Sequence, residues 1–145
     1  QVVLSGATAA IERAMKLAPE MGARRALPLP VSAPFHCAMM APAAEAMAEA
    51  LATASIDAPA IPVVANVTAG SVNDPPIIRR LLVEQVTGMV RWRESVLYMK
   101  EQGVDTLIEL GAGKVLTGLT KRIDRELTGR SVEGPADIEA LLKDL

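Results

Sequence analysis

The chain contains a single histidine, His36, in a setting that suits acid–base chemistry. It follows Ser32-Ala33-Pro34-Phe35, in which Pro34 restricts the backbone shortly before the imidazole. The segment joins an extended stretch to a predicted helix, and ligand sites of α/β proteins collect at such junctions. An imidazole there can act as general base for a hydroxyl nucleophile, provided that a second group orients the ring. The alternative is a structural histidine that is satisfied by a backbone partner.

The chain offers no evident nucleophile for such a base. None of its serines lies in the Gly-x-Ser-x-Gly pattern of a nucleophile elbow. They are Ser5, Ser32, Ser55, Ser71, Ser95 and Ser131. Cys37 adjoins His36, but neighbouring side chains diverge, so we interpret Cys37 as a small residue that fills the start of the helix. The pattern therefore predicts a base whose partner is not in this chain.

A second candidate site is the turn Gly111-Ala112-Gly113-Lys114. Val115 stands where a phosphate-binding P-loop has Ser or Thr, and Leu116 stands where a dinucleotide fingerprint has its third glycine. We therefore interpret the turn as a strand-to-helix connection. Glu109 precedes this turn, and two interpretations stay open: an acceptor for the imidazole, or a buried carboxylate paired with an arginine or lysine.

Strand and helix patterns alternate along the chain, which predicts an α/β fold. We expect helices at residues 8–21, 39–52, 77–85, 92–102, 115–127 and 136–145, and strands at 2–4, 61–67 and 104–110. Residues 25–31 contain Pro28 and Pro30 and are expected to be an edge strand or an extended connector. The opening then forms a small β-α-β unit. Residues 68–76 and 128–135 are expected to be loop and linker, and the apolar run 104–110 predicts burial on both faces of a parallel sheet.

The composition excludes several classes of function. With 145 residues, 50% hydrophobic and 22% charged, the chain can bury a core. Only 2% of the residues are aromatic and the net charge is −2, so we expect no nucleic-acid partner. One Cys and one His exclude a disulfide framework and Cys- or His-based metal sites, and the lone Cys fits a cytoplasmic location. No apolar run approaches the roughly twenty residues of a membrane-spanning helix, so no membrane partner is expected.

Three segments together resemble malonyl-CoA:acyl-carrier-protein transacylase of type II fatty-acid synthesis. They are RALPLPVSAPFHC at residues 25–37, QGVD at 102–105 and ELGAGKVLTGLTKR at 109–122. The similarity runs in order over nearly the whole chain, and only the carboxy-terminal half or so of the family is represented. The chain also opens inside a predicted strand, with Gln1 rather than Met, so we interpret it as a piece of a longer protein.

The resemblance implies an acyltransferase that moves malonyl from coenzyme A to the phosphopantetheine thiol of acyl carrier protein, in fatty-acid biosynthesis. The intermediate is an acyl-serine in a Gly-His-Ser-Leu-Gly motif. The resemblance implies His36 as the base and the main-chain carbonyl of Gln85 as the acceptor that orients it. A neutral acceptor sets the tautomer without a buried charge beside the malonyl carboxylate, which leaves Glu109 a structural role. A coenzyme A thioester is the substrate, and no bound cofactor is implied.

The family architecture is an α/β-hydrolase-like large subdomain with an inserted ferredoxin-like small subdomain. By resemblance, residues 1–31 are part of the small subdomain and residues 32–145 are the carboxy-terminal part of the large one. Phe35 accompanies malonyl in polyketide relatives and is a weak signal for substrate binding. Arg24 and Arg25 would lie on the small subdomain, as candidates for docking the acidic carrier protein.

The resemblance places the serine, the oxyanion hole and the arginine for the malonyl carboxylate upstream of Gln1. The amino-terminal half is therefore a further expected partner, and we predict that the 145-residue chain alone transfers no acyl group. Two other hypotheses remain open. One is a non-catalytic fragment or diverged relative that binds a carrier protein, and the other is a phosphate-binding protein that uses the turn from Gly111 to Lys114.

Overall fold

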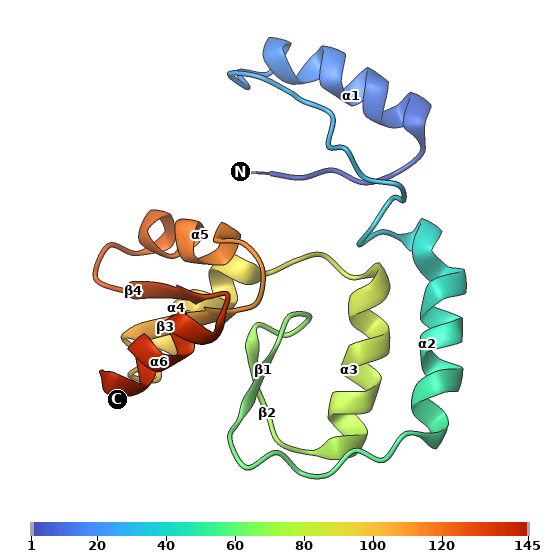
Figure 1. Ribbon diagram of the computed structural model, residues 1–145. Coiled ribbons are helices and arrows are strands. Elements are labelled where there is room, and N and C mark those ends of the chain that lie inside the picture. The colour runs from blue at the N-terminus through green and yellow to red at the C-terminus, as the bar shows by residue number, and fades with distance from the viewer. Residues whose placement is uncertain (1, 145) are drawn as a thin grey trace. The chain divides into compact units, whose positions relative to one another are not determined.

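The computed structural model describes residues 2–144. The chain forms two compact units (Figure 1). Unit 1 comprises Gln1–Val67 and Ser71–Val90, and unit 2 comprises Thr68–Gly70 and Arg91–Leu145. Some predicted ranges include Gln1 or Leu145, and these two positions lie outside the described residues. No helix within residues 2–144 is long and apolar enough to cross a membrane.

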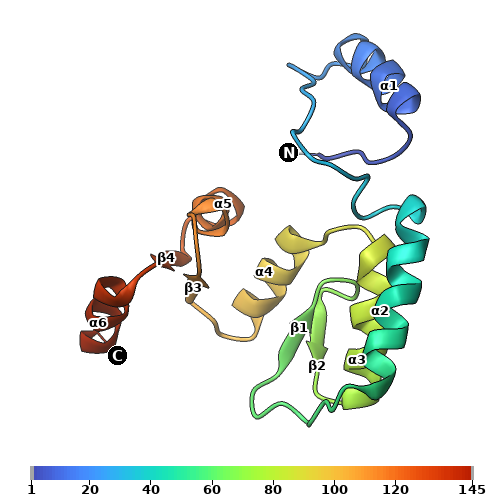
Figure 2. The same ribbon diagram turned by 45° about the vertical axis from the view of Figure 1, so that its right-hand side comes forward.

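Unit 1 is mainly helical. Its elements are α1 (Thr8–Glu20), the short 3-10 helix η1 (Ala38–Met40), α2 (Ala41–Thr53), β1 (Val63–Ala65), most of β2 (Gly70–Val72) and α3 (Pro75–Thr87). Both α2 and α3 have proline in the first turn, where its missing N–H costs no helical hydrogen bond. The two helices lie side by side (Figures 1 and 2), and Arg79 of α3 donates a hydrogen bond of 2.9 Å to the carbonyl of Ala54, just beyond the end of α2.

Unit 2 is built on a parallel pair of strands. Its elements are α4 (Trp92–Glu101), β3 (Thr106–Leu110), α5 (Val115–Ile123), β4 (Thr128–Val132) and α6 (Pro135–Lys143). β3 pairs with β4 in parallel, in a register from Thr106 opposite Thr128 to Leu110 opposite Val132. Helices α5 and α6 flank this strand pair (Figure 2). The buried side chains of the unit include Val96, Thr120, Leu127 and Val132.

The predicted α/β class and the six predicted helices are confirmed, with boundary changes of a few residues. The parallel sheet at 104–110 is also confirmed, but burial on both of its faces is wrong. Side chains along β3 alternate between exposed and half-buried, and Leu110 is 75% exposed. Within residues 2–144 this sheet has only two strands, so many side chains of β3 are not covered by neighbouring elements.

The other strand predictions need correction. Residues 2–4 and 25–31 form no strand and have no ladder partner, so the opening is not a β-α-β unit. The strand predicted at 61–67 shortens to β1, and the predicted loop 68–76 contains β2. The predicted linker 128–135 contains β4, which exists because β3 offers it a complete hydrogen-bonding edge. The two compact units divide chiefly near residue 90, and the subdomain boundary at residue 31 stays a prediction.

Candidate active site

The structure brings His36 against the carboxy-terminal end of α3. Its Nδ1 atom lies 3.1 Å from the carbonyl oxygen of Gln85 and 3.1 Å from the carbonyl oxygen of Gly88. All three residues belong to unit 1. Gln85 contributes through its backbone, so the contact between His36 and this residue has the form that the resemblance implies.

The acceptors are available because helix α3 ends there. The last four carbonyls of a helix have no partner within it, and together they form the negative pole of the helix dipole. Gln85 lies in the last turn of α3, and Gly88 caps the helix, with its own N–H donating to Glu84 at 3.0 Å. The helix end therefore presents partial negative charge to the imidazole without any ionised side chain.

The turn that carries His36 is held in an unusual conformation. His36 has φ of 59°, in the left-handed region, which non-glycine residues visit rarely and histidine more often than most. Local hydrogen bonds hold the turn: Phe35 N–H donates to Ala33 at 2.9 Å, and the Cys37 thiol donates to the carbonyl of Pro34 at 3.1 Å. Cys37 directly precedes η1 and is half-buried, in keeping with its interpretation as a residue that fills the helix start.

This arrangement defines the protonation pattern of the neutral ring. Because carbonyl oxygens only accept hydrogen bonds, Nδ1 must carry the proton and Nε2 keeps its lone pair. Within residues 2–144, both hydrogen bonds of His36 are made at Nδ1, and the residue is exposed. The free lone pair of Nε2 can therefore accept a proton from a hydroxyl or thiol.

The second acceptor, Gly88, was not among the residues predicted from the sequence. A backbone carbonyl leaves no signal in residue type, and Gly88 looked only like the end of a helix. The glycine relieves a close approach: a Cβ here would lie 3.1 Å from the carbonyl oxygen of Glu84. A larger residue at this position would require the last turn of α3 to shift by a few tenths of an ångström.

The remaining predicted site residues lie in unit 1. Phe35 directly precedes His36 and is 45% exposed. Arg24 and Arg25 are exposed in the connection that follows α1, and within residues 2–144 neither forms a salt bridge. The structure does not assign them a ligand, and their roles stay predictions.

Glu109 caps helix α5 and, within residues 2–144, forms no ion pair with an arginine or lysine. Its carboxylate accepts hydrogen bonds from the backbone N–H of Thr117 at 2.8 Å and of Leu116 at 3.1 Å. These amides, that of Thr117 most strongly, lower the pKa of Glu109. In unit 1, the acceptors at Nδ1 of His36 are the carbonyls of Gln85 and Gly88.

The same contact argues against a phosphate site at the turn from Gly111 to Lys114. The helix N-terminus that would bind an anion already holds the carboxylate of Glu109. A phosphate there would lose these donors and meet a like charge.

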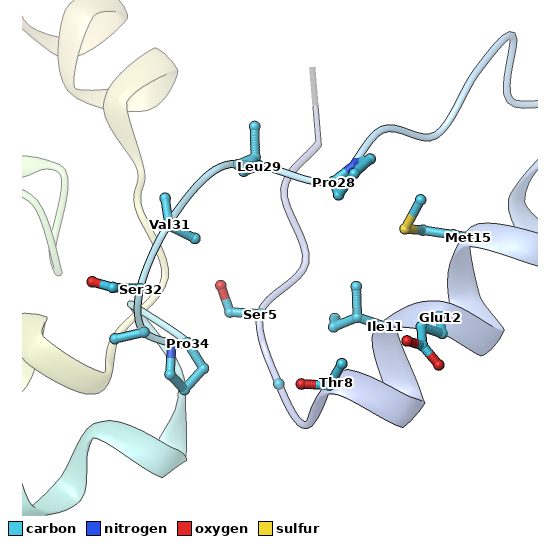
Figure 3. A pocket seen from close by; sticks show the side chains of 12 residues that line it. Ser5, Thr8, Ile11, Glu12, Met15, Pro28, Leu29, Val31, Ser32 and Pro34 are labelled. Atoms are coloured by element: carbon cyan, nitrogen blue, oxygen red, sulfur yellow. The ribbon is translucent and has the colours of Figure 1, made fainter.

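A cavity of about 400 Å³ lies in unit 1 between α1 and the extended segments on either side of it (Figure 3). Its walls combine apolar side chains with hydroxyl groups and the carboxylate of Glu12. Its lining ends at Pro34 and does not include His36, Gln85 or Gly88. Within residues 2–144, no group of three or more His, Cys, Asp or Glu is placed to hold a metal ion.

Fold and site together define an α/β protein with a histidine whose Nδ1 is held by backbone carbonyls and whose Nε2 is free. The chain is 49% identical over 142 residues to the malonyl CoA-acyl carrier protein transacylase of Salmonella typhimurium, covering 98% of this chain and 46% of the relative. It is 42% identical over 145 residues to the transacylase of Bacillus subtilis, covering 100% of this chain and 46% of the relative. No protein-family model matches the chain.

Solved structures agree. An acyl-carrier-protein-S-malonyltransferase from Bartonella henselae matches with a TM-score of 0.90 and 49% identity, over 96% of this chain and 44% of that one. A malonyl-transacylase in complex with a type II PKS acyl-carrier protein matches with a TM-score of 0.91 and 44% identity, over 97% of this chain and 45% of that one. The chain is therefore similar over nearly its whole length to part of these malonyl CoA-acyl carrier protein transacylases, and it spans about half the length of the curated relatives it matches. The resemblance stated from the sequence is confirmed over that length.

Proposed function

We propose that this chain supplies the histidine base of an acyltransferase that moves malonyl from coenzyme A to the phosphopantetheine thiol of acyl carrier protein. The observation that carries the proposal is the contact of His36 Nδ1 with the carbonyls of Gln85 and Gly88, each at 3.1 Å. It leaves Nε2 as the proton acceptor. The relatives that match nearly the whole chain are named for this reaction.

In the proposed reaction, Nε2 of His36 takes the proton of a serine hydroxyl as the serine oxygen attacks the malonyl thioester carbonyl. The carbon–sulfur bond then breaks, and the imidazolium returns the proton to the departing coenzyme A thiolate. In the second half, Nε2 takes the proton of the phosphopantetheine thiol, whose sulfur attacks the carbonyl carbon of the acyl-serine. The ester carbon–oxygen bond then breaks, and the imidazolium returns the proton to the departing serine oxygen. The serine belongs to a family segment that is absent from the present sequence.

The neutral acceptors suit this chemistry. A carboxylate beside His36 would add a negative charge near the malonyl carboxylate, whereas two carbonyls stabilise the imidazolium through their dipoles alone. The proposal requires no metal and no bound cofactor, because every group that transfers a proton or an acyl chain is a side chain or a substrate.

The finer assignments belong to the same proposal. Residues 1–31 would be part of a ferredoxin-like small subdomain, and residues 32–145 part of an α/β-hydrolase-like large subdomain. Phe35 would contact the acyl group, since it directly precedes the base. Arg24 and Arg25 would dock an acidic carrier protein, since both are exposed and cationic. The protein would act in the cytoplasm.

The test uses a longer protein that contains this chain together with the nucleophile segment. We expect His36→Ala to slow malonyl transfer by about 10²–10⁴, the range for loss of a general base. The matched control is Asn73→Ala, which changes an exposed residue of the loop before α3. Unchanged transfer in the His36 variant would remove His36 from the mechanism. The 145-residue chain alone, incubated with malonyl-CoA, should show no ester adduct by intact mass, and a stoichiometric adduct would overturn that expectation.

Carrier binding without catalysis is the second candidate, favoured by the exposed Arg24 and Arg25 with no salt bridge within residues 2–144. It predicts that the chain binds holo acyl carrier protein, that the double variant Arg24→Ala/Arg25→Ala weakens binding, and that His36→Ala does not. Calorimetric titration of the three proteins tests carrier binding, and the transfer assay with His36→Ala separates the two functions, because only the first requires transfer that depends on His36.

A further inference from the structure

Beyond Gln85 and Gly88, a third residue of unit 1 contacts the segment whose carbonyl accepts from the imidazole. Asn66 directly follows β1, and its Nδ2 atom donates a hydrogen bond of 3.0 Å to the carbonyl oxygen of Met89. Met89 is the residue after Gly88, whose carbonyl accepts from His36. Asn66, Gly88, Met89 and His36 all belong to unit 1.

Within residues 2–144, the side chains of Met89 and Val90 do little to hold the segment from Gly88 to Val90. The side chain of Met89 is 70% exposed and that of Val90 is 51% exposed, so apolar burial contributes little to its conformation. We therefore expect hydrogen bonds to determine the orientation of the Gly88 carbonyl. On one side, Gly88 N–H donates to Glu84 at 3.0 Å, and on the other, Asn66 holds the carbonyl of Met89.

We propose that Asn66 is a positioning residue for His36: by holding the carbonyl of Met89, it aims the carbonyl of Gly88 at Nδ1 and so maintains the tautomer in which Nε2 is free. In this role Asn66 acts through the backbone of Gly88 and Met89. Its effect on catalysis rests on the proposed function, whereas its effect on the ring rests on the contacts alone.

The ring can be observed directly, because the chain has only one histidine. In ¹⁵N-labelled chain at neutral pH, the two ring nitrogens of His36 should show the well-separated shifts of an Nδ1–H tautomer. In Asn66→Ala the two shifts should move toward each other, and exchange of the Nδ1 proton with water should accelerate by roughly fivefold, the factor for one lost neutral hydrogen bond. Asn73→Ala is the matched control and should reproduce the wild-type spectrum.

A second variant distinguishes a positioning role of Asn66 from a structural one. Asn66→Asp keeps the size of the side chain, but its carboxylate is unable to donate and repels the carbonyl of Met89, so it should change the ring at least as much. Wild-type ring shifts in both variants would overturn the proposal. Loss of the dispersed amide spectrum in both would overturn it too, because Asn66 would then be a structural residue.

The catalytic consequence is measured separately, in the longer protein. There Asn66→Ala should lower kcat and leave the KM for malonyl-CoA unchanged. A changed ring with unchanged kcat would contradict the role of His36 in the proposed function and leave the positioning by Asn66 intact. An unchanged ring would contradict the positioning, whatever the rate.

Discussion

The Nδ1 atom of His36 lies 3.1 Å from the carbonyl oxygen of Gln85, a residue 49 positions further along the chain. The contact joins a turn in the left-handed region to the negative end of a helix. Since the acceptor is a main-chain atom, the orientation of the imidazole depends on where α3 ends and not on which side chain stands at residue 85. This distinguishes the site from a triad in which a carboxylate side chain orients the histidine.

The first prediction follows from that distinction. In a longer protein that contains this chain, Gln85→Ala should alter malonyl transfer by less than about threefold, against the 10²–10⁴ expected for His36→Ala. Alanine keeps the carbonyl and favours the helix. Steady-state kinetics of both variants make the comparison, and a loss in Gln85→Ala as large as in His36→Ala would show that the amide side chain takes part.

The second prediction concerns Glu109, whose pKa is lowered by the amides that it caps, that of Thr117 most strongly. A carboxyl group with a lowered folded-state pKa stabilises the protein above its unfolded-state pKa, and this contribution is lost as the pH falls through the folded value. Glu109→Gln should therefore lower Tm by a few degrees at pH 7, and the difference from wild type should shrink below the ordinary pKa of 4.5.

Thermal unfolding at several pH values measures this difference. Glu139→Gln is the control, because Glu139 is exposed on α6 and loses a charge without losing a cap. If Glu109→Gln and Glu139→Gln shift Tm equally at every pH, the capping role of Glu109 is wrong.

The third prediction concerns Lys100 at the end of α4. Its Nζ atom lies 2.5 Å from Oδ2 of Asp124 and 2.7 Å from Oε2 of Glu126. The hydrogen bond from Lys100 lowers the pKa of Asp124. Lys100→Met should therefore raise the pKa of Asp124 toward its ordinary value and reduce thermal stability at neutral pH. By the same linkage, the stability difference should vanish in acid, where Asp124 is protonated in wild type as well.

Carboxyl titration by NMR follows Asp124, and thermal unfolding follows stability. Lys143→Met removes an exposed lysine from the last turn of α6 and serves as the control. An unchanged Asp124 titration in Lys100→Met would contradict the assignment of the pKa shift to this lysine.

Some elements of the fold could be predicted from the sequence and others could not. Helix α5 was predicted from its apolar spacing at Leu116, Leu119 and Ile123, because one face of a helix repeats within a short window. β4, with the sequence TGRSV, has no apolar alternation and contains a glycine, so no local pattern marked it. It is a strand because β3 pairs with it, a contact between distant residues. The opposite error occurred at residues 2–4, which look like a strand but have no partner.

Of the candidate site, too, some residues could be predicted from the sequence and others could not. His36 was found from its residue type and its turn, and Gln85 from the resemblance. Gly88 and Asn66 were not predicted, because one acts through a carbonyl that every residue has, and the other through contact with a backbone atom 23 positions away. Backbone acceptors of this kind become visible only when the path of the chain is known.

The last prediction compares the effect on stability of replacing two glycines of unit 2 by alanine. A Cβ on Gly129 of β4 would lie 3.2 Å from the carbonyl oxygen of Thr117 and 3.3 Å from Cβ of the buried Thr120, so α5 would have to move away from the strand. Gly129→Ala should therefore destabilise the chain by about 1–3 kcal/mol, the usual cost of overpacking. Gly118 is exposed on α5 with nothing near its missing Cβ, and Gly118→Ala should stabilise by about 0.5–1 kcal/mol through helix propensity. Urea unfolding of the two variants measures both signs, and stabilisation by Gly129→Ala would mean that α5 and β4 are not packed as closely as the structure has them.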